Sequence, residues 1–216
     1  MTGKIEEFLI TMAVLIISVT LHEFGHAFAA DRLGDDTPRG QGRLSILPPD
    51  HLDPLGTIMM AISSWLGFGI GWGKPVMTNP SNFRNPRRDQ GIVAVAGPAS
   101  NIVQAVVFAG IVRFSLGAMV GENGYLSPLG VFLLSGVTIN LALAFFNLIP
   151  LKPLDGSWIV TALLPARLAY SYEAWMMRYG PLVFLLLIFV FPSFVGMLIG
   201  PPVYFVRGIL LRGVPL

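Results

Sequence analysis

The sequence predicts an all-α polytopic membrane protein with about four spanning helices. Of its 216 residues, 54% are hydrophobic and only 12% are charged, whereas a soluble domain carries about 25% charged residues. Four apolar runs are long enough to cross a hydrocarbon core of about 30 Å, at 8–30, 92–114, 129–149 and 181–200. We therefore expect one integral membrane domain over 1–216, with its core at 8–160 and a C-terminal helical region at 181–216.

A fifth apolar run, at 54–72, is a weaker candidate for a span. Small and polar residues interrupt it, namely Ser63, Ser64, Gly67, Gly69 and Gly71. We expect the segment near 54–73 to be re-entrant or peripheral rather than a full crossing. The tail at 201–216 is too short to count as a span of its own.

The charged residues and the absence of cysteine limit the classes of function. The net charge is +2, but the Lys and Arg residues sit in short connectors between apolar runs, where they set membrane topology. No nucleic-acid partner is expected. The chain has no cysteine, so thiolate catalysis and Cys-ligated metals are excluded, and any metal must use His, Asp or Glu.

Three ionisable residues, His22, Glu23 and His26, lie inside the first apolar run. Each costs roughly 2.5–3.5 kcal/mol inside a membrane, so their presence needs a reason. In an H-E-x-x-H pattern, the two histidines share one face of a helix and grip a metal, while the glutamate serves as general base. The alternative is a structural pair of histidines satisfied by neighbouring helices, with Glu23 as a buried partner.

A catalytic zinc site also needs a third protein ligand. The carboxylates near apolar runs are Asp53, Asp89, Glu122, Asp155 and Glu173. Asp155 is the best placed, because the segment 147–156 follows directly on a span and contains prolines that end the helix. Non-helical backbone at membrane depth is tolerated where it lines a cavity or is buried in protein. By composition alone, a surface turn at this point is an equally good interpretation.

Three motifs in this order resemble the site-2 protease family of intramembrane zinc metalloproteases. They are HEFGH at 22–26, AGPASN at 96–101, and the N-x-x-P-x-x-x-x-D-G pattern at 147–156. HLDPLG at 51–56 and GWGKPV at 71–76 resemble loop motifs of a short prokaryotic branch of the family. The similarity covers about 8–160, without the PDZ-like or nucleotide-binding modules of other members.

The resemblance assigns roles to individual residues. His22, His26 and Asp155 match the ligands of one zinc ion per chain. Glu23 matches the general base that takes a proton from water. Asn147 matches an asparagine that holds the substrate strand or the developing oxyanion.

Five further residues are candidates for contacts with the substrate or for supporting the ligands. Gly97 and Asn101 match a family motif that shapes the substrate path. His51 is expected near the metal, where it lines or gates the site, with Asp53 as its orienting partner; the alternative is a loop histidine bonded to nearby backbone. Lys74 lies in GWGKPV, a segment that offers a strand edge to an unwound substrate.

The ligands also demand that the helices at 8–30 and 129–149 end on the same side of the membrane. Three apolar runs follow the first helix up to 149, so one of them must not cross, and 54–72 is the natural choice. This topology gathers most Lys and Arg residues on the side of the connectors at 31–53, 73–91 and 151–180. By the positive-inside rule, that side is the cytoplasm.

The predicted function is therefore an intramembrane zinc metalloprotease in a prokaryotic plasma membrane, with its active site toward the cytoplasmic face. Its partners would be the lipid bilayer and a membrane-protein or membrane-peptide substrate. A homo-oligomer or a regulatory partner is left open as a means of control. The alternatives are a membrane metal transporter and a non-catalytic membrane scaffold.

Overall fold

The computed structural model describes residues 2–67, 71–121 and 125–214, and this part of the chain is helical apart from isolated bridges and connectors. Its helices are α1 (Thr2–Arg32), α2 (Thr37–Gly40), α3 (Pro48–His51), α4 (Pro54–Leu66), the 3-10 helix η1 (Pro80–Asn82), α5 (Pro86–Phe114), α6 (Leu116–Met119), α7 (Pro128–Asn147), α8 (Asp155–Leu163), α9 (Ala166–Phe189) and α10 (Pro192–Leu210). Within the described part, five helices are long and apolar enough to cross a membrane: α1, α5, α7, α9 and α10. The predicted all-α membrane class is confirmed.

Proline begins four of the six described helices that are longer than ten residues, α4, α5, α7 and α10. Its fixed φ suits the first helical position, where its missing N–H is not needed. Two of the starts are also capped by side chains: Asp53 accepts the N–H of Gly56, and Ser127 accepts the N–H of Gly130. The helix starts are therefore set by the local sequence, even where the apolar composition runs on through a boundary.

The weak run at 54–72 forms α4, which has 13 residues. At 1.5 Å per residue it is about 20 Å long, too short for a crossing. Leu52 before this helix and Gly73 after it form an antiparallel bridge, and the N–H of Lys74 donates to the carbonyl of His51. The two ends of this segment therefore lie next to each other, as predicted for a segment that does not cross the membrane. Residues 68–70 lie outside the described part.

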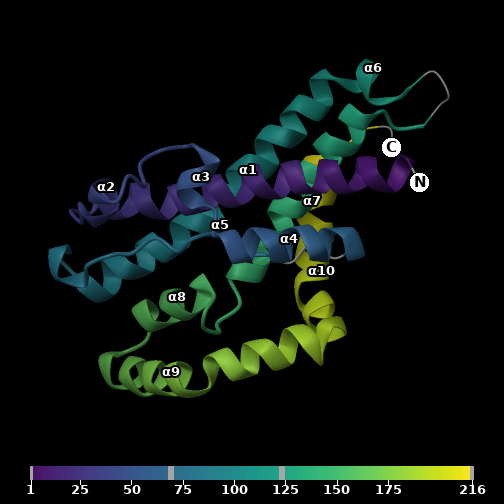
Figure 1. Cartoon of the computed structure of the whole chain (residues 1–216). Helices are drawn as coiled ribbons and strands as arrows, with labels where there is room; N and C mark the ends of the chain where they lie inside the picture. Colours follow the sequence, from purple (N-terminus) through teal and green to yellow (C-terminus); the bar gives the residue numbers. More distant parts are fainter. Residues whose placement is uncertain (1, 68–70, 122–124, 215–216) are drawn as a thin grey trace.

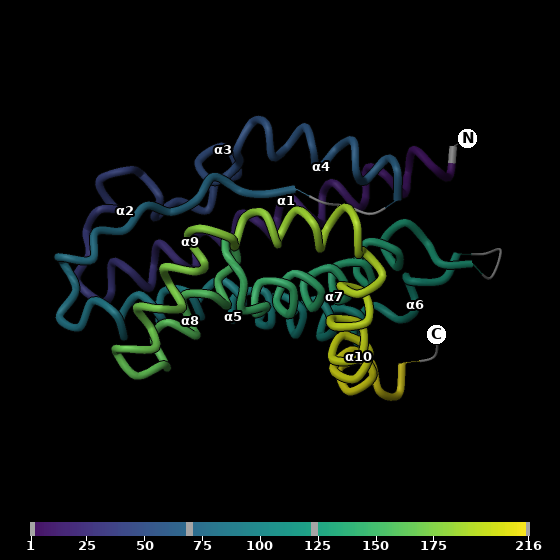
Figure 2. Tube along the Cα trace, turned by 90° about the horizontal axis from the view of Figure 1, so that it is seen from below, coloured from purple at the N-terminus to yellow at the C-terminus, as the bar shows by residue number. Residues whose placement is uncertain are grey.

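The C-terminal region differs from the expected single span at 181–200. The chain breaks at residues 190–191 into α9 and α10, because Pro192 starts a new helix and Phe191 before it is not helical. A continuous apolar composition hid this break from the hydropathy pattern. In Figures 1 and 2, α10 runs across the direction of α1, whereas α9 runs largely along it.

The core that positions the site is formed by α1, α5 and α7, which pack against one another, with α8 packed on α5. The main cluster of buried side chains lies between α5, α7 and α10 and includes Phe108, Val112, Leu133 and Leu141. Figure 1 shows the C-terminal end of α1 on the same side as the start of α5 and the start of α8. The predicted same-side arrangement of the two ligand-bearing segments is therefore present.

Candidate metal centre

The two histidines of the first apolar run project from one face of α1. His22 and His26 are four residues apart, and their Nε2 atoms lie 3.0 Å from each other. Both side chains are buried, with 8% of each residue exposed. They lie about 15 and 9 Å before the end of α1, at 1.5 Å per residue.

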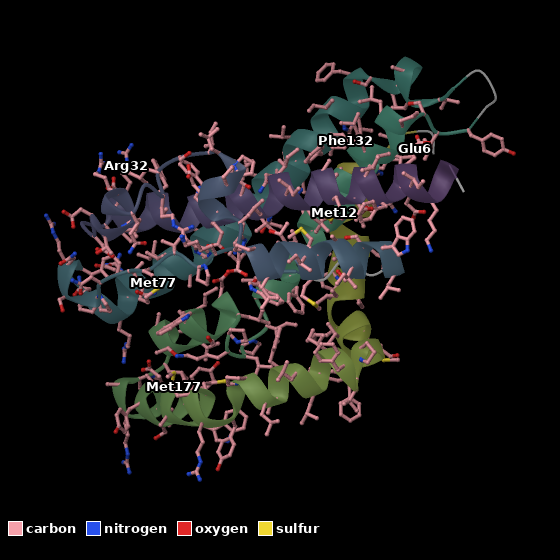
Figure 3. All side chains as sticks on the ribbon, in the orientation of Figure 1. Glu6, Met12, Arg32, Met77, Phe132 and Met177 are labelled. Carbon is pink, nitrogen blue, oxygen red and sulfur yellow. The ribbon has the colours of Figure 1, made fainter. Side chains whose placement is uncertain are left out.

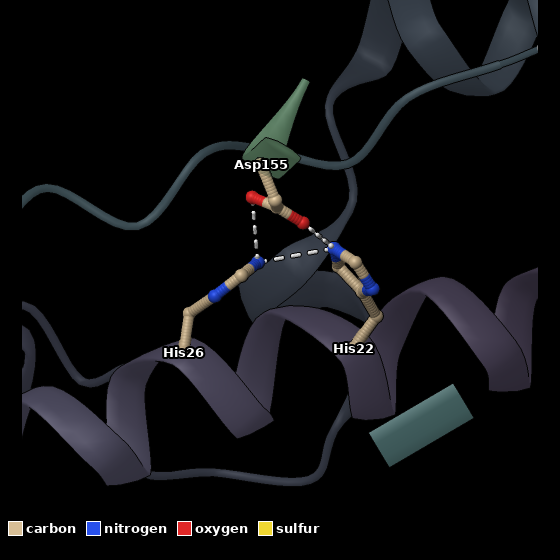
Figure 4. Close-up of side chains that lie close together, drawn as sticks. All are labelled: His22, His26 and Asp155. Atoms are coloured by element: carbon tan, nitrogen blue, oxygen red, sulfur yellow. Dashed lines mark hydrogen bonds and ion pairs between the residues drawn. The ribbon is translucent and has the colours of Figure 1, made fainter. Parts of the chain in front are cut away.

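Asp155 meets the histidines from a different part of the chain (Figure 4). It is the first residue of α8, directly after the connector that follows α7. One carboxylate oxygen lies 3.3 Å from His22 Nε2 and the other 3.3 Å from His26 Nε2. Gly156 next to it must be glycine, since a Cβ there would come within 2.3 Å of the Leu148 carbonyl oxygen. This packing holds the start of α8 against the end of α7.

Hydrogen bonds on the far side of each imidazole fix which nitrogen faces the cluster. His26 Nδ1 lies 2.7 Å from the carbonyl oxygen of Val93, which only accepts, so Nδ1 carries the proton. His22 Nδ1 lies 2.7 Å from Asn101 Oδ1, while the Asn101 amide nitrogen donates to the backbone carbonyl oxygen of Ser18 and to Oδ1 of Asn140. Both Nε2 atoms are therefore unprotonated in neutral imidazoles. In these neutral forms, two nitrogen lone pairs and a carboxylate face one another.

The donor set fits a zinc ion. Ligand atoms bonded tetrahedrally at 2.0–2.1 Å lie about 3.3 Å apart, and the three separations here are 3.0, 3.3 and 3.3 Å. Oδ2 of Asp155 is buried and accepts no hydrogen bond, which is costly unless a cation is nearby. Among the described residues, this is the one group of three or more His, Asp or Glu side chains placed to share an ion.

Gly97 and Asn101 lie behind the histidines on α5. A Cβ at Gly97 would come within 2.3 Å of His26 Nε2, so only glycine leaves room for the imidazole rings of His22 and His26. Asn101 is fully buried and orients His22. Neither residue lines the large cavity described next, so they act on the ligands rather than on the wall of a substrate path.

A cavity of about 1210 Å³ opens beside the three ligands. Glu23 lines it next to His22, and the Asn147 side chain lines it from the end of α7. Asn147 Nδ2 donates to the carbonyl oxygen of Leu143 at 3.0 Å, which uses one of its two N–H groups. The predicted general base and the predicted amide donor thus share a cavity with the metal ligands.

The other residues predicted for the site, His51, Asp53 and Lys74, do not line the cavity. His51 is fully buried, does not line the cavity, and its Nε2 lies 2.7 Å from the carbonyl oxygen of Ser45. This is the loop histidine bonded to nearby backbone that the sequence left as an alternative. Asp53 caps α4 through Gly56 and is not bonded to His51. Lys74 is exposed and does not line the cavity, whereas Gly73 and Pro75 on either side of it do.

Comparison with known proteins bears out the resemblance of the motifs. A model of peptidase family M50 matches residues 126–190. The chain is 38% identical to YwhC of Bacillus subtilis over 174 residues, which cover 80% of this chain and 77% of YwhC. The chain belongs to peptidase family M50. This is the site-2 protease family, so the protein is a zinc metalloprotease and an integral membrane protein.

Other relatives of this M50 peptidase also carry zinc metalloprotease in their names. Rip2 of Mycobacterium tuberculosis (strain H37Rv) is 31% identical over 202 residues, covering 89% of this chain and 71% of Rip2. MJ0392 of Methanocaldococcus jannaschii is 28% identical over 157 residues, but these cover only 35% of that longer protein. No solved structure matches the chain.

Asn140 of the M50 peptidase is a site residue that sequence reasoning missed. It is fully buried in the middle of α7, where its Oδ1 accepts a hydrogen bond of 2.9 Å from Asn101 Nδ2. It therefore fixes the amide that orients His22. The available signal was an amide in the middle of a mostly apolar run, because polar side chains in spans are rare and serve a site.

Replacing Asn101 with alanine is expected to weaken zinc binding by about 10–100-fold, as for other residues that orient metal-ligating histidines. The reason is that His22 loses the acceptor of its Nδ1 proton. The measurement is a competition titration of zinc against a chelator. Gln104→Ala is the matched control, since Gln104 is also buried on α5 and donates to the same Ser18 carbonyl without touching a histidine. An equal loss in both variants would contradict the assignment.

Arg43 is another residue that the sequence did not single out. Its guanidinium is buried and donates to the carbonyl oxygens of Asp50, Lys74 and Pro75 at 2.5, 3.1 and 3.4 Å. Gly73 is adjacent to this clamp and lies against Glu23, where an added Cβ would meet the Glu23 side chain at 2.9 Å. Arg43 thus holds the extended chain at 73–75 beside Glu23, the predicted general base.

Arg43→Met is expected to lower the free energy of unfolding by about 2–3 kcal/mol, because three carbonyl groups lose a charged donor. Thermal unfolding in detergent measures this loss. Arg39→Met serves as the comparison: Arg39 pairs with Asp31 on the surface, and such solvent-exposed pairs contribute little to stability. Similar shifts of the unfolding temperature for both variants would refute the clamp.

Two buried charges stabilise the connectors around the site. Burial raises the pKa of Asp35, but hydrogen bonds from Thr37, Asn79 and Asn82 outweigh burial and lower it overall. Asp35 thereby ties the chain at 79–82 to the end of α1 as a carboxylate. Burial also lowers the pKa of Lys152, whose Nζ lies 3.9 Å from the ring centre of Trp158.

Proposed function

We propose that this M50 peptidase hydrolyses a peptide bond within or near a transmembrane segment of a membrane-protein or membrane-peptide substrate. In this proposal His22, His26 and Asp155 hold one zinc ion, Glu23 is the general base and Asn147 stabilises the oxyanion. The active site would face the cytoplasmic side of a prokaryotic plasma membrane. Most Lys and Arg residues lie in the connectors at 31–53, 73–91 and 151–180, on the same side as the proposed ligands.

The shape of the large cavity is the observation that carries the proposal. Its wall follows α1 from His26 back to Lys4, a distance of about 33 Å at 1.5 Å per residue. This matches the hydrocarbon thickness of about 30 Å. Other lining residues, Phe184, Ile188 and Val195, come from α9 and α10. The cavity is therefore a groove as long as a spanning helix, with the ligand cluster at one end.

Apolar walls suit a substrate helix in lipid, but hydrolysis also needs an exposed peptide bond. Gly73 and Pro75 lie on extended chain that lines the groove beside Glu23. An unwound stretch of substrate would add alongside this chain as a strand, as extended peptides do on other exposed edges. The substrate helix would thus unwind only where it reaches the ligand cluster.

The residues of the chain divide the chemistry between them. When bound, zinc supplies Lewis acidity that makes both water and the peptide carbonyl more reactive. A Glu23 carboxylate oxygen takes the proton of the attacking water and passes it to the leaving amine nitrogen. The second N–H of the Asn147 amide donates to the carbonyl oxygen as negative charge develops on it.

A metal transporter is the alternative that shares the composition of this chain. Transport would require ligands spaced along a route through the membrane. The described part of the chain offers a single cluster of three ligands, at one end of α1. A non-catalytic scaffold would be expected to lack one of these ligands or the adjacent glutamate, and all four residues are present.

The test uses the purified full chain reconstituted in liposomes with fluorescent single-span peptides. Mass spectrometry of the products should place the cut inside the apolar span or within a few residues of it. A water-soluble unfolded protein such as casein should be cut more slowly at the same concentration. Cleavage confined to soluble substrates, with spans left intact, would overturn the proposal while leaving a zinc protease.

A further inference from the structure

A second, smaller cavity of about 470 Å³ lies where α1 ends and α5 begins, away from the metal centre. Three arginines, Arg32, Arg84 and Arg88, line it, together with the apolar Leu33 and Ile92. Figure 3 shows Arg32 at this end of α1, where side-chain nitrogen atoms gather, and Glu6 at the opposite end. We call these three arginines and the space between them the arginine pocket.

The positive charge of the arginine pocket is not neutralised within the described part of the chain. Asp89 is the one acidic residue in its wall, and it is buried and accepts the N–H of Asn85 as part of the start of α5. The nearby Asp31 already makes two hydrogen bonds, of 2.8 and 2.9 Å, to Arg39. The arginine pocket therefore favours an anion from outside the chain.

Its position in the membrane narrows the choice of anion. Arg32 is the last residue of one candidate span, and Arg88 lies in the first turn of another. The arginine pocket thus lies where the hydrocarbon core gives way to the headgroups. Beyond it, exposed apolar residues of α5 recur at helical spacing, at Ile92, Val95 and Val103. This stripe runs from the pocket toward the membrane interior.

We propose that the arginine pocket binds the phosphate headgroup of an anionic phospholipid, whose acyl chains lie along the stripe of α5. Guanidinium groups bind phosphate oxygens in pairs of parallel hydrogen bonds, and basic pockets between spanning helices bind anionic headgroups. Free inorganic phosphate shares the headgroup chemistry but has no acyl chains to contact the apolar stripe. Because α1 and α5 also position His22 and His26, the lipid would hold together the two helices of the metal centre.

The experiment is native mass spectrometry of the full chain, titrated in mild detergent with phosphatidylglycerol or phosphatidylcholine. We expect the wild type to retain one phosphatidylglycerol in preference to phosphatidylcholine. Arg84→Gln/Arg88→Gln should weaken that binding roughly 30-fold, given about 1 kcal/mol for each basic residue near anionic lipid. Arg167→Gln/Arg178→Gln, which removes two exposed charges from α9, should bind as the wild type does.

Three results would overturn the proposal. They are equal retention of the two lipids by the wild type, equal weakening in both double variants, and displacement of the lipid by equimolar inorganic phosphate. Zinc content, measured on the same samples, shows that the double variants are folded. It also separates this lipid site from the protease function, because neither variant touches the metal ligands.

Discussion

Asp155→Ala is expected to abolish stoichiometric zinc binding in the purified protein. Asp155 is the one proposed ligand that does not come from α1, and its two oxygens lie 3.3 Å from the two histidine Nε2 atoms. Without it, two neutral imidazoles would remain, and the charge of the ion would lose its counter-charge. We expect a loss of affinity larger than the about 10–100-fold typical of residues outside the ligand set, and proteolysis should disappear with the metal.

The measurement is zinc per chain by elemental analysis after dialysis at fixed free zinc. Asp36→Ala is the control, since it removes an exposed carboxylate from the connector after α1. Asp155→Asn adds a finer test, because it keeps the shape and removes the charge. Full zinc occupancy in Asp155→Ala would show that Asp155 is not a ligand, and the assembly of α1 with α8 around a metal would have to be abandoned.

The metal centre was visible in the sequence because its main signal is local. Spacing of four residues places His22 and His26 on one helical face whatever the rest of the chain does. Asp155 was harder, since nothing local distinguishes a ligand from a turn residue there, and the order of motifs in the family decided it. The structure brings the three together.

The supporting residues were less predictable because their roles depend on packing between distant segments. Arg43 binds carbonyl groups more than 30 residues later in the chain, and nothing near it in sequence shows this. Asn140 reaches Asn101 across a helix interface. His51 is a case where the sequence left two interpretations open: its loop lies on the expected side, and the Ser45 carbonyl engages its ring nitrogen, as the second interpretation expects.

Helix boundaries also differed in how well the local sequence predicted them. The breaks marked by proline with a capping side chain, such as Asp53 before Pro54, lie in the local sequence. The break between α9 and α10 is also marked by a proline, Pro192, but no side chain caps it, and hydropathy averaged over the surrounding apolar residues merged parts of both helices into one span. Composition predicts how much chain enters the membrane better than it predicts where one helix ends.

Glu23→Gln is expected to reduce proteolysis by about 10²–10⁴-fold, the range typical of a lost general base, while zinc binding persists. Glu23 lies one residue after His22, so α1 turns its side chain away from the ligand face and into the cavity. Glutamine keeps the size of the side chain but cannot accept a proton from water at neutral pH. The three ligands are untouched, so metal content should match that of the wild type.

Cleavage of a reconstituted single-span peptide and zinc content, measured on the same preparation, separate the two roles. Glu6→Gln is a matched control, because Glu6 lies on the same helix, is exposed and does not line the groove; it should cut at the wild-type rate. Loss of zinc in Glu23→Gln would make Glu23 part of the metal site. Undiminished cleavage would require another base, and among the described residues that line the groove the remaining carboxylates are Glu7, near the far end of α1, and Asp155, in the ligand cluster. Among these carboxylates, Glu23 is therefore the one that lies beside the proposed ligands without being one of them.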